Sequence, residues 1–194
     1  MRSRRDEVLQ AALELLDEVG LDHLTVRRLA ARLGVQPGAL YRHFANKRAL
    51  LDAMVEQIAA QKADQPLPSG EWDEQVHRLA AAIRDGMLGY RDGARLLATF
   101  HAAGPAAVSS FLRFVALLQA AGATKELAGA GVDTIICYVN GFTIEEQAGG
   151  RIGPPQSPRV DRDRAFHAGL ALIIDGLRAA IARQGTAAEG ARLW

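Results

Sequence analysis

Apolar side chains recur at the spacing of an α-helix along most of the 194-residue chain. A first set near the N-terminus falls on one helical face: Val8, Ala12, Leu15, Leu16 and Val19. Ser3 and Asp6 are placed to cap the start of this helix, and Gly20 is placed to end it. The pattern therefore predicts an amphipathic first helix with defined ends.

Three further helices are predicted in the stretch that follows. A second helix starts at Thr25, a residue type that caps helices well. A third starts at Pro37 in the segment QPGALYRHF, where Leu40 and Phe44 lie four residues apart and face the core. A fourth starts after Asn46, so four helices fit within roughly sixty residues.

The remainder of the chain also follows the helical pattern, without strand-like alternation. PLPSG, at residues 66–70, is the first clear break and predicts an inter-domain turn. Two long helices are predicted over Thr124–Ala148 and Asp161–Gln184, separated by GGRIGPPQSPR, whose Gly and Pro content predicts a mobile loop. The expected fold class is all-α.

Composition favours a soluble, cytoplasmic protein. Apolar residues make up 49% of the chain, which suffices for one core or for a small domain joined to a larger one. The single cysteine, Cys137, excludes an intrachain disulfide and a multi-cysteine metal site, and it fits a reducing compartment. We find no apolar run of about 20 residues and no signal peptide, so no membrane association is expected.

Positive charge is concentrated near the N-terminus, although the formal net charge is only +1. Residues 1–48 hold nine basic and six acidic side chains, whereas the rest of the chain holds fourteen and sixteen. The stretch LTVRRLAARLGVQPGALYRHFANKR, residues 24–48, has no carboxylate and six basic side chains: Arg27, Arg28, Arg32, Arg42, Lys47 and Arg48. It is either a solvated basic face or a surface for an acidic partner.

The second and third predicted helices, joined by a tight turn and backed by the first helix, have the layout of a helix-turn-helix. Such a unit places its second helix in the major groove of DNA. With Leu40 and Phe44 inward, the exposed positions are Gln36, Pro37, Ala39, Tyr41, Arg42 and His43. Gln pairs with adenine, Arg with guanine, and small apolar groups contact thymine methyls. The layout therefore favours DNA binding over a solvated face, although Arg32 and Arg48 individually fit an ordinary surface.

Other residues in the same stretch suit the sugar-phosphate backbone. Thr25 and Asn46 start helices whose free N–H groups can hold phosphates, and Lys47 adds charge beside the second of these helix starts. Gly38 and Ala39 are small enough to let the third helix approach DNA closely.

The segment LTVRRLAARLGVQPGALYRHFANKRALLDAM resembles the N-terminal domain of the TetR family of bacterial transcriptional regulators, through the pattern LA..LGV....LY.HF..K..LL. GYRDGARL, GFTIEEQA and AFHAGLALIIDGL resemble segments of the tetracycline-repressor branch, so the resemblance spans most of the chain. It implies an all-helical homodimer with a helix-turn-helix DNA-binding domain over 1–48, a connecting helix over 49–65, and an effector-binding and dimerisation domain over 66–194.

The resemblance also implies roles for single positions. The family's contacts to bases or to the groove floor fall on Arg27, Gln36, Pro37, Gly38 and Ala39. Its contacts to the DNA backbone fall on Thr25, Tyr41, His43 and Lys47. Gly38, Ala39 and Arg42 replace different side chains, so the operator sequence is expected to differ.

The tetracycline-repressor branch binds its drug as a magnesium chelate, through polar side chains and a histidine. Here Leu97 takes the position of that histidine, whereas Glu145 keeps an acidic position, and one carboxylate alone is a poor magnesium site. We therefore expect an apolar pocket with no metal and no cofactor, and a hydrophobic or amphipathic effector; a residual metal role of Glu145 stays open. The expected ligand residues are Leu79, Ile83, Leu97, Phe100, His101, Phe114, Cys137 and Asn140.

Three of these residues have a second interpretation. His101 or Asn140 would orient a ligand by hydrogen bonds. Alternatively, His101 faces solvent at a helix end and Asn140 pairs across a dimer. The second interpretation of Cys137 is that it is a buried small hydrophobic residue.

The two long C-terminal helices carry apolar residues that serve as core, as a dimer interface, or as both on different faces. The resemblance implies a four-helix interface between two subunits, in which Gly169 and Ala171 allow close approach.

No HExxH, Gly-rich phosphate loop or Gly-x-Ser-x-Gly motif is present, so no catalytic residue is expected.

The expected function is that of a ligand-responsive regulator, by family resemblance a repressor. It would occupy a palindromic operator in double-stranded DNA as a homodimer and leave it when a small molecule binds. A constitutive DNA-binding dimer without an effector is the alternative, and a small-molecule-binding enzyme is a weaker one.

Overall fold

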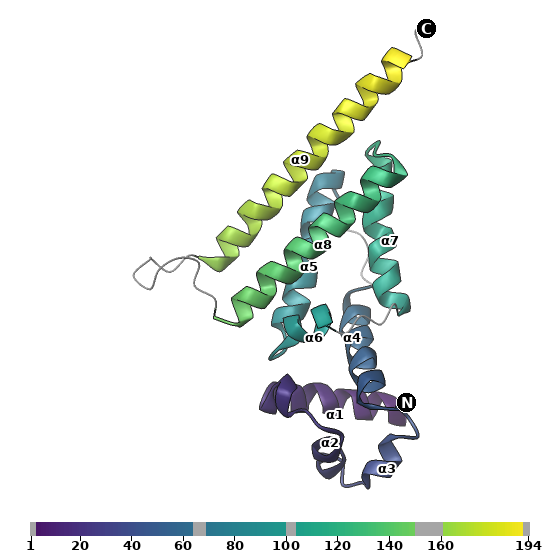
Figure 1. The fold of residues 1–194 in the computed structure, drawn as a ribbon, viewed down its shortest axis with the longest axis vertical. Helices are drawn as coiled ribbons and strands as arrows, with labels where there is room; N and C mark the ends of the chain where they lie inside the picture. The colour runs from purple at the N-terminus through teal and green to yellow at the C-terminus, as the bar shows by residue number, and fades with distance from the viewer. Residues whose placement is uncertain (1–2, 64–68, 100–103, 150–160, 192–194) are drawn as a thin grey trace. The chain divides into compact units, whose positions relative to one another are not determined.

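A computed structural model describes residues 3–63, 69–99, 104–149 and 161–191, and these ranges contain helices and no strands (Figure 1). The predicted all-α fold class is confirmed. Phe100, His101 and most of the two linkers predicted at 66–70 and 149–159 lie outside the described residues. The helices are α1 (Arg4–Val19), α2 (Val26–Arg32), α3 (Pro37–Leu40), α4 (Lys47–Ala63), α5 (Trp72–Leu88), α6 (Gly93–Thr99), α7 (Pro105–Ala120), α8 (Lys125–Gln147) and α9 (Arg162–Ala191), with a 3₁₀ turn at Leu21–His23.

The chain divides into two compact units. Unit 1 comprises residues 1–64 and 85–108, and unit 2 comprises residues 65–84 and 109–194. The division falls within α5, which contributes its last residues to unit 1. The functional domain limits expected after residues 48 and 65 stay predictions, because these units are defined by packing and not by function.

The first helices of unit 1 start at the residues that the sequence indicates. Ser3 and Asp6 form a reciprocal capping box at the start of α1. Thr25 Oγ1 accepts a hydrogen bond of 3.2 Å, and Asn46 Oδ1 one of 2.8 Å, each from the backbone N–H three residues further on. A cap of this kind contributes about 1 kcal/mol, so three local sequence signals fix where the chain turns into helix.

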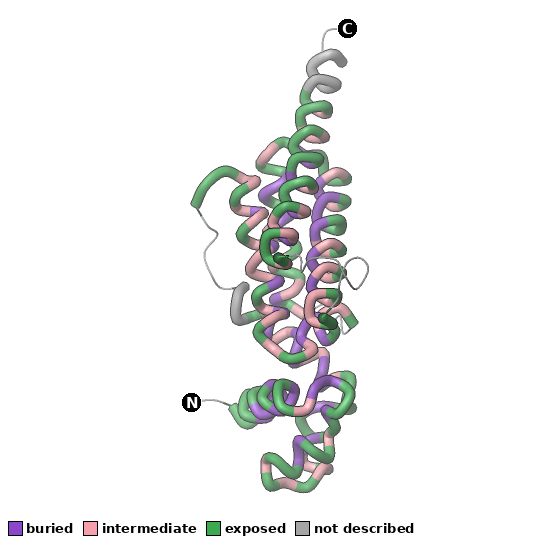
Figure 2. Tube along the Cα trace, turned by 90° about the vertical axis from the view of Figure 1, so that its left-hand side faces the viewer, coloured by how far each residue is buried: buried purple, intermediate pink, exposed green. Residues whose placement is uncertain are grey.

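The inward residues of the first four helices form the core of unit 1 (Figure 2). Leu13, Leu16, Leu29 and Met54 have 0% of their surface exposed. Burying one such side chain contributes about 1.5–3 kcal/mol. This core is the rigid support for the exposed side chains of α2, α3 and the start of α4.

The third helix is shorter than the sequence indicates. The segment QPGALYRHF was expected to be helical, but α3 ends at Leu40 and continues as a turn. The Leu40 carbonyl accepts N–H hydrogen bonds from both His43 and Phe44, each at 3.0 Å, which closes the helix there. Leu40 and Phe44 are nevertheless buried as predicted, at 4% and 6% exposed.

The turn between α5 and α6, within GYRDGARL, is held to the end of α1. The Leu21 N–H donates to Asp92 Oδ2 at 2.8 Å, and the Arg91 N–H donates to Asp17 Oδ1 at 2.7 Å. Asp92 has a positive φ of 56°, and a Cβ on Gly20 would lie 2.8 Å from its carboxylate. Glycine at position 20 therefore leaves room for the carboxylate that joins this turn to α1.

In unit 2 the helices α8 and α9 lie side by side and run in opposite directions (Figure 1). Both helices carry fully buried apolar residues, including Ile135 and Val139 on α8 and Phe166 on α9, and the Phe166 ring contacts the rings of Tyr138 and Phe142 on α8. The bounds of α8 match the prediction, with Thr124 as its N-cap. By contrast, α9 continues past its predicted end at Gln184, as far as Ala191.

Gly169 has a role within the chain that the sequence did not indicate. Tyr138 on α8 donates from its hydroxyl to the Phe166 carbonyl at 2.9 Å. A Cβ on Gly169 would lie 2.2 Å from that hydroxyl oxygen, so only glycine leaves room for it. The predicted use of Gly169 for close approach of a second subunit stays a prediction beside this intrachain contact.

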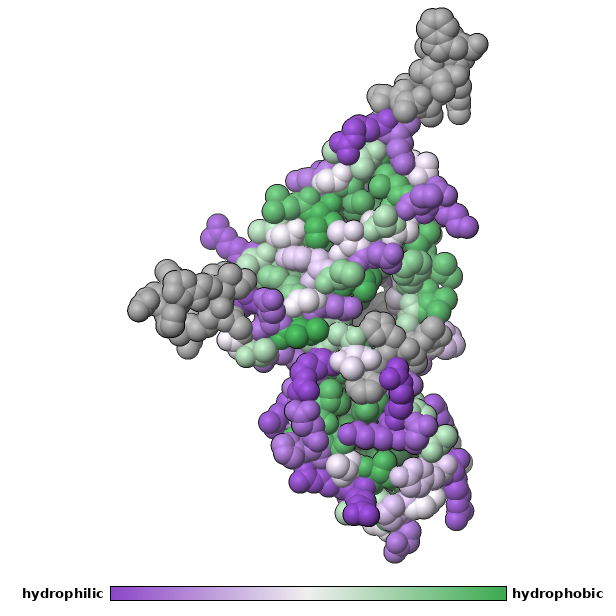
Figure 3. All heavy atoms as spheres, viewed as in Figure 1, coloured by the Kyte–Doolittle hydropathy of each residue, from purple (hydrophilic) through white to green (hydrophobic). Residues whose placement is uncertain are grey.

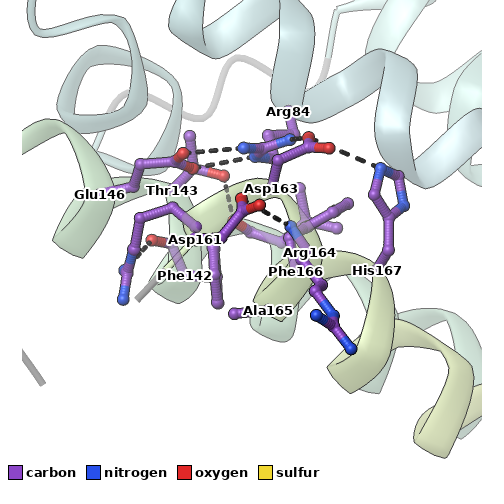
Figure 4. A network of polar contacts seen from close by, with 12 residues as sticks. Arg84, Phe142, Thr143, Glu146, Asp161, Asp163, Arg164, Ala165, Phe166 and His167 are labelled. Carbon is purple, nitrogen blue, oxygen red and sulfur yellow. Dashed lines mark hydrogen bonds and ion pairs between the residues drawn. The ribbon is translucent and has the colours of Figure 1, made fainter. Parts of the chain in front are cut away.

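A buried arginine joins three helices of unit 2 (Figure 4). Arg84 on α5 is 5% exposed and donates to both carboxylate oxygens of Glu146 on α8, at 2.9 and 2.7 Å. It also donates to Asp163 on α9 at 2.8 Å. The Arg84 guanidinium lowers the pKa of Asp163, and the Glu146 carboxylate raises the pKa of Arg84.

Two histidines meet between α5 and α9. His77 Nε2 lies 3.2 Å from His167 Nδ1, and the two rings are stacked with centroids 4.8 Å apart. The other ring nitrogen of His167, Nε2, lies 3.6 Å from Asp163 Oδ1 (Figure 4). Burial lowers the pKa of His77, and the facing His167 lowers it further.

Unit 2 has apolar surface that one chain does not cover. Windows in Lys125–Gln147 and Arg162–Gly185 reach mean hydropathies of 1.3 and 1.5, with 33% and 22% of each window buried. Neither helix is an uninterrupted apolar run, because charged residues occur along both. Leu172 on α9 is 75% exposed, and apolar residues gather on the surface of unit 2 in Figure 3. Two such helices are weak support for a membrane span, and they also suit helices that pack against a partner protein.

Arg84→Ala is expected to lower the free energy of unfolding by about 3 kcal/mol, because Glu146 would keep a largely buried charge without its partner. Urea denaturation at fixed protein concentration measures the free energy of unfolding of the variant and of the wild type. Arg178→Ala is the control, since Arg178 pairs with Asp73 and Asp175 but its side chain is 51% exposed. Equal destabilisation of the two variants would contradict the role assigned to Arg84.

The His77–His167 contact predicts that unit 2 loses stability in acid. Because the pKa of His77 is lowered from 6.5 on folding, the unfolded chain binds a proton more readily than the folded one. The stabilisation is complete above pH 6.5 and is lost as the pH falls below it. Melting temperatures at about pH 7.5 and pH 5.5 test this.

His77→Gln should reduce the acid-induced drop in melting temperature, because the Gln amide replaces Nε2 without titrating. His23→Gln, on an exposed turn of unit 1, is the matched control and should keep the wild-type drop. A drop that is the same in all three proteins would exclude the histidine pair as its source.

Candidate nucleic-acid interface

The turn between α2 and α3 is compact and held by backbone hydrogen bonds. The Val35 N–H donates to the Ala30 carbonyl at 3.0 Å, and Gly34 has a φ of 66°, which favours glycine. Gln36 then occupies the N-cap of α3, and Pro37 its first turn. Two short helices on a common core are thus separated by a few residues, which is the helix-turn-helix layout.

The residues predicted to contact DNA all lie on the accessible side of this motif. Tyr41 is 51% exposed although it is a large aromatic residue, and a Cβ on Gly38 would meet nothing within 4 Å. We call the following residues, all exposed or half-exposed, the candidate interface: Thr25, Arg27, Gln36, Pro37, Gly38, Ala39, Tyr41, Arg42, His43 and Lys47. Their individual roles stay predictions.

Ion pairs separate the basic side chains of residues 24–48 into two groups. Arg32 is paired with Glu18 at 2.7 Å and with Glu14 at 3.0 Å, both from α1, and these carboxylates raise its pKa. Arg48 lies 3.9 Å from Asp52. The interpretation of Arg32 and Arg48 as ordinary surface residues therefore fits their surroundings.

Arg27, Arg42 and Lys47 differ from this first group. Within the described part of the chain, none of the three forms an ion pair or a side-chain hydrogen bond. Arg28 is intermediate, because it donates to the His23 carbonyl at 3.1 Å. The three cations of this stretch that form neither an ion pair nor a side-chain hydrogen bond thus belong to the candidate interface, where they are available to phosphates.

The start of α4 adds a second feature for anions. Asn46 caps the helix through the Ala49 N–H, and no acidic residue lies in the first turn. Lys47, the first residue of α4, is exposed. A helix start with free N–H groups and an adjacent cation favours binding of phosphate.

The predicted effector residues are distributed over both units. Leu97 in unit 1 packs against the core of that unit, whereas Phe114 in unit 2 is 1% exposed. Leu79, Ile83 and Asn140 are half-buried in unit 2. Phe100 and His101 lie outside the described residues. The effector site stays a prediction.

The second interpretation of Cys137, as a buried small hydrophobic residue, is wrong for the single chain, whereas its role in ligand binding stays a prediction. Cys137 is exposed on α8, two residues from Ile135 and from Val139, which are both buried. Two residues correspond to about 200° around an α-helix, so Cys137 faces away from the core.

A groove of about 320 Å³ in unit 2 is distinct from the predicted effector site. It lies between α5 and α9, and none of the eight predicted ligand residues lines it. Its lining is mostly charged: Asp73, Glu74, His77, Arg78, Asp175 and Arg178, with Ala171 and Ile174. Within the described ranges, no three His, Cys, Asp or Glu side chains are grouped to hold a metal ion.

Sequence reasoning missed a contact between α4 and the start of α7. Glu56 Oε1 accepts the Ala106 N–H at 2.7 Å, and a Cβ on Gly104 would lie 2.1 Å from Glu56 Oε2. Glu56 therefore caps α7 from another helix. No local pattern marks such a cap, because the two residues are 50 positions apart.

Comparison with known proteins gives matches over both halves of the chain. The family model of bacterial regulatory proteins, tetR family, matches residues 8–54, and that of the tetracyclin repressor-like C-terminal domain matches residues 65–155. The tetracycline repressor protein class A from transposon 1721 of Escherichia coli is 39% identical over 191 residues, 88% of each chain.

Two solved structures are also similar. A TetR variant from Acinetobacter baumannii AYE in complex with minocycline is 36% identical, with a TM-score of 0.80 over 92% of this chain and 98% of that one. BioQ with its natural double-stranded DNA operator is 36% identical, with a TM-score of 0.77 over 92% and 99% of the two chains.

The N-terminal family match contains α2, α3 and the start of α4, where the structure places the helix-turn-helix and its unpaired cations. The full-length relative extends the similarity through unit 2. The chain therefore belongs to the TetR family of bacterial regulatory proteins, in its tetracycline-repressor branch.

Proposed function

We propose that this regulator is a repressor that occupies a palindromic DNA operator as a homodimer and leaves it when an apolar or amphipathic small molecule binds. The observation that carries the proposal is the group of cations in the candidate interface, Arg27, Arg42 and Lys47, none of which forms an ion pair or a side-chain hydrogen bond with a described residue. BioQ, a similar protein, has been crystallised with its double-stranded DNA operator.

Specific roles follow from position and chemistry. Gln36 and Arg42 read base edges, because amide and guanidinium groups bind adenine and guanine bidentately. Arg27, on α2, also contacts base edges. Gly38 and Ala39 let α3 approach the groove floor, and Pro37 packs there. Thr25, Tyr41, His43 and Lys47 contact the backbone and set the register of the motif.

Dimerisation supplies the second half of the operator contact. The partly uncovered apolar helices α8 and α9 suit packing against the same helices of a second chain. Two-fold symmetry then requires the two α3 helices to lie about 34–36 Å apart, so that they meet successive major grooves. The protein acts in the cytoplasm and binds its effector without catalysing a reaction on it.

The effector is expected to be chemically different from minocycline, which is present in the structure of a similar TetR variant from Acinetobacter baumannii AYE. In this chain Leu97 stands where the family has its metal-binding histidine, and Leu79, Ile83 and Phe114 are apolar as well. Such a set favours a ligand that is bound mainly by apolar contact.

A ligand releases the protein from DNA only if it binds more tightly to the conformation that does not bind the operator. The coupling free energy between the ligand site and the DNA site is typically about 1–3 kcal/mol. The helix α4 begins at Lys47 and carries Glu56, which caps α7. A change at the start of α7 therefore acts on the helix that presents Lys47 to DNA.

Arg27→Ala is expected to lower the preference for operator over unrelated DNA by about 1–3 kcal/mol, because no guanidinium then binds the base edge. Lys47→Ala is expected to weaken binding to all duplexes alike and to flatten the salt dependence. Gel-shift titrations with both duplexes, at several salt concentrations, measure these effects.

Arg32→Ala is the matched control, since its charge is already neutralised by Glu14 and Glu18. It should bind DNA nearly as the wild type does. Wild-type binding by both Arg27→Ala and Lys47→Ala would show that the candidate interface is assigned to the wrong surface.

A melting-temperature screen tests the class of effector. Apolar and amphipathic compounds are expected to stabilise the protein, by about 2.7 kcal/mol at a hundred times the dissociation constant. Tetracycline with magnesium chloride is expected to give no shift. Ile83→Gln should lose the stabilisation by the apolar compound. Stabilisation by hydrophilic chelates alone would overturn the proposed effector class.

A further inference from the structure

Four basic side chains of unit 1 make neither an ion pair nor a hydrogen bond within the described part of the chain: Arg5, Arg27, Arg42 and Lys47. Three of them belong to the candidate interface. The fourth, Arg5, lies on α1, which the resemblance and the helix-turn-helix layout leave out of DNA contact. Its neighbour Arg4 is paired with Glu7 at 2.7 Å.

The structure shows where Arg5 stands. Its guanidinium carbon lies 5.2 Å from the centroid of the Phe44 ring, in a cation–π contact. Phe44 is 6% exposed and belongs to the core. The ring of a buried aromatic residue thus lies beneath the guanidinium of an arginine that is itself exposed to water.

Phe44 lies in the middle of the candidate interface along the chain. It directly follows Tyr41, Arg42 and His43, and it comes three residues before Lys47 at the start of α4. The contact with Phe44 therefore brings the N-terminal turn of α1 to the junction between α3 and α4. At this junction the backbone-contacting residues on either side of Phe44 are exposed.

We propose that Arg5 is a further DNA-binding residue, which extends the candidate interface onto α1 through a contact to a backbone phosphate. This inference rests on the proposed function. A guanidinium suits the contact because it stays charged, presents several N–H donors in one plane and is weakly hydrated. The contact carries no base information, so it strengthens binding to all sequences equally.

Two variants separate the charge of Arg5 from its packing on Phe44. Arg5→Lys keeps the positive charge, whereas Arg5→Met removes the charge and leaves an unbranched apolar side chain beside Phe44. Arg4→Met is the matched control, because Arg4 is adjacent, exposed and already paired with Glu7. Melting temperatures of the three variants show whether unit 1 stays folded.

Binding is measured by fluorescence anisotropy with a random-sequence duplex of about 30 base pairs and with a selected operator, from about 50 to 200 mM KCl. Arg5→Met is expected to weaken binding to both duplexes by the same factor. It should also lower the slope of log affinity against log salt by about 0.9 for each phosphate that the protein no longer neutralises, hence by about 1.8 for a dimer. Arg5→Lys and Arg4→Met are expected to retain the wild-type slope.

An Arg5→Met slope equal to that of Arg4→Met would overturn the inference, as would weaker binding confined to the operator duplex. Lys47→Ala, measured in the same series, separates this failure from that of the proposed function. If Lys47→Ala weakens binding and Arg5→Met does not, only the role of Arg5 is wrong. If neither weakens binding, the candidate interface itself is wrong.

Discussion

Burial of Leu40 and Phe44 determines which side chains of the short α3 segment remain accessible. The helix has only four residues, Pro37–Leu40, and an isolated helix of that length does not persist in water. Packing of these two side chains against α1 and α4, at 4% and 6% exposed, therefore holds the segment in place. The arrangement of Gln36 to His43 follows from core packing and not from helix propensity.

Charge pairing complements this packing in unit 1. Carboxylates of α1 and of the turn after it neutralise Arg32 and Arg95, both by short ion pairs. Arg27, Arg42 and Lys47 have no such partner among the described residues. Of the four basic side chains that form neither an ion pair nor a hydrogen bond in the described part of unit 1, three thus belong to this motif, although the net charge of the chain is only +1. Net charge alone would not have revealed this, because it sums paired and unpaired side chains equally.

Local signals predicted much of this fold, whereas contacts between distant segments were out of reach. The caps at Ser3, Thr25 and Asn46 depend on neighbours within three residues, and they were confirmed. The end of α3 at Leu40, the cap of α7 by Glu56 and the Arg84–Glu146 pair depend on tertiary packing, which a periodic pattern does not encode. Tertiary packing also distinguishes two adjacent arginines, because Arg4 pairs with Glu7 on its own helix whereas Arg5 contacts the distant Phe44.

The proposed function requires that α3 reads DNA from a symmetric dimer. Selection of bound duplexes from a random pool tests it most directly, since it requires no knowledge of the operator or of the effector. We expect enrichment of a palindrome whose half-sites are centred about 10 base pairs apart, or at a multiple of that distance. Recovery of unrelated sequences, or of a single half-site without a symmetric partner, would contradict it.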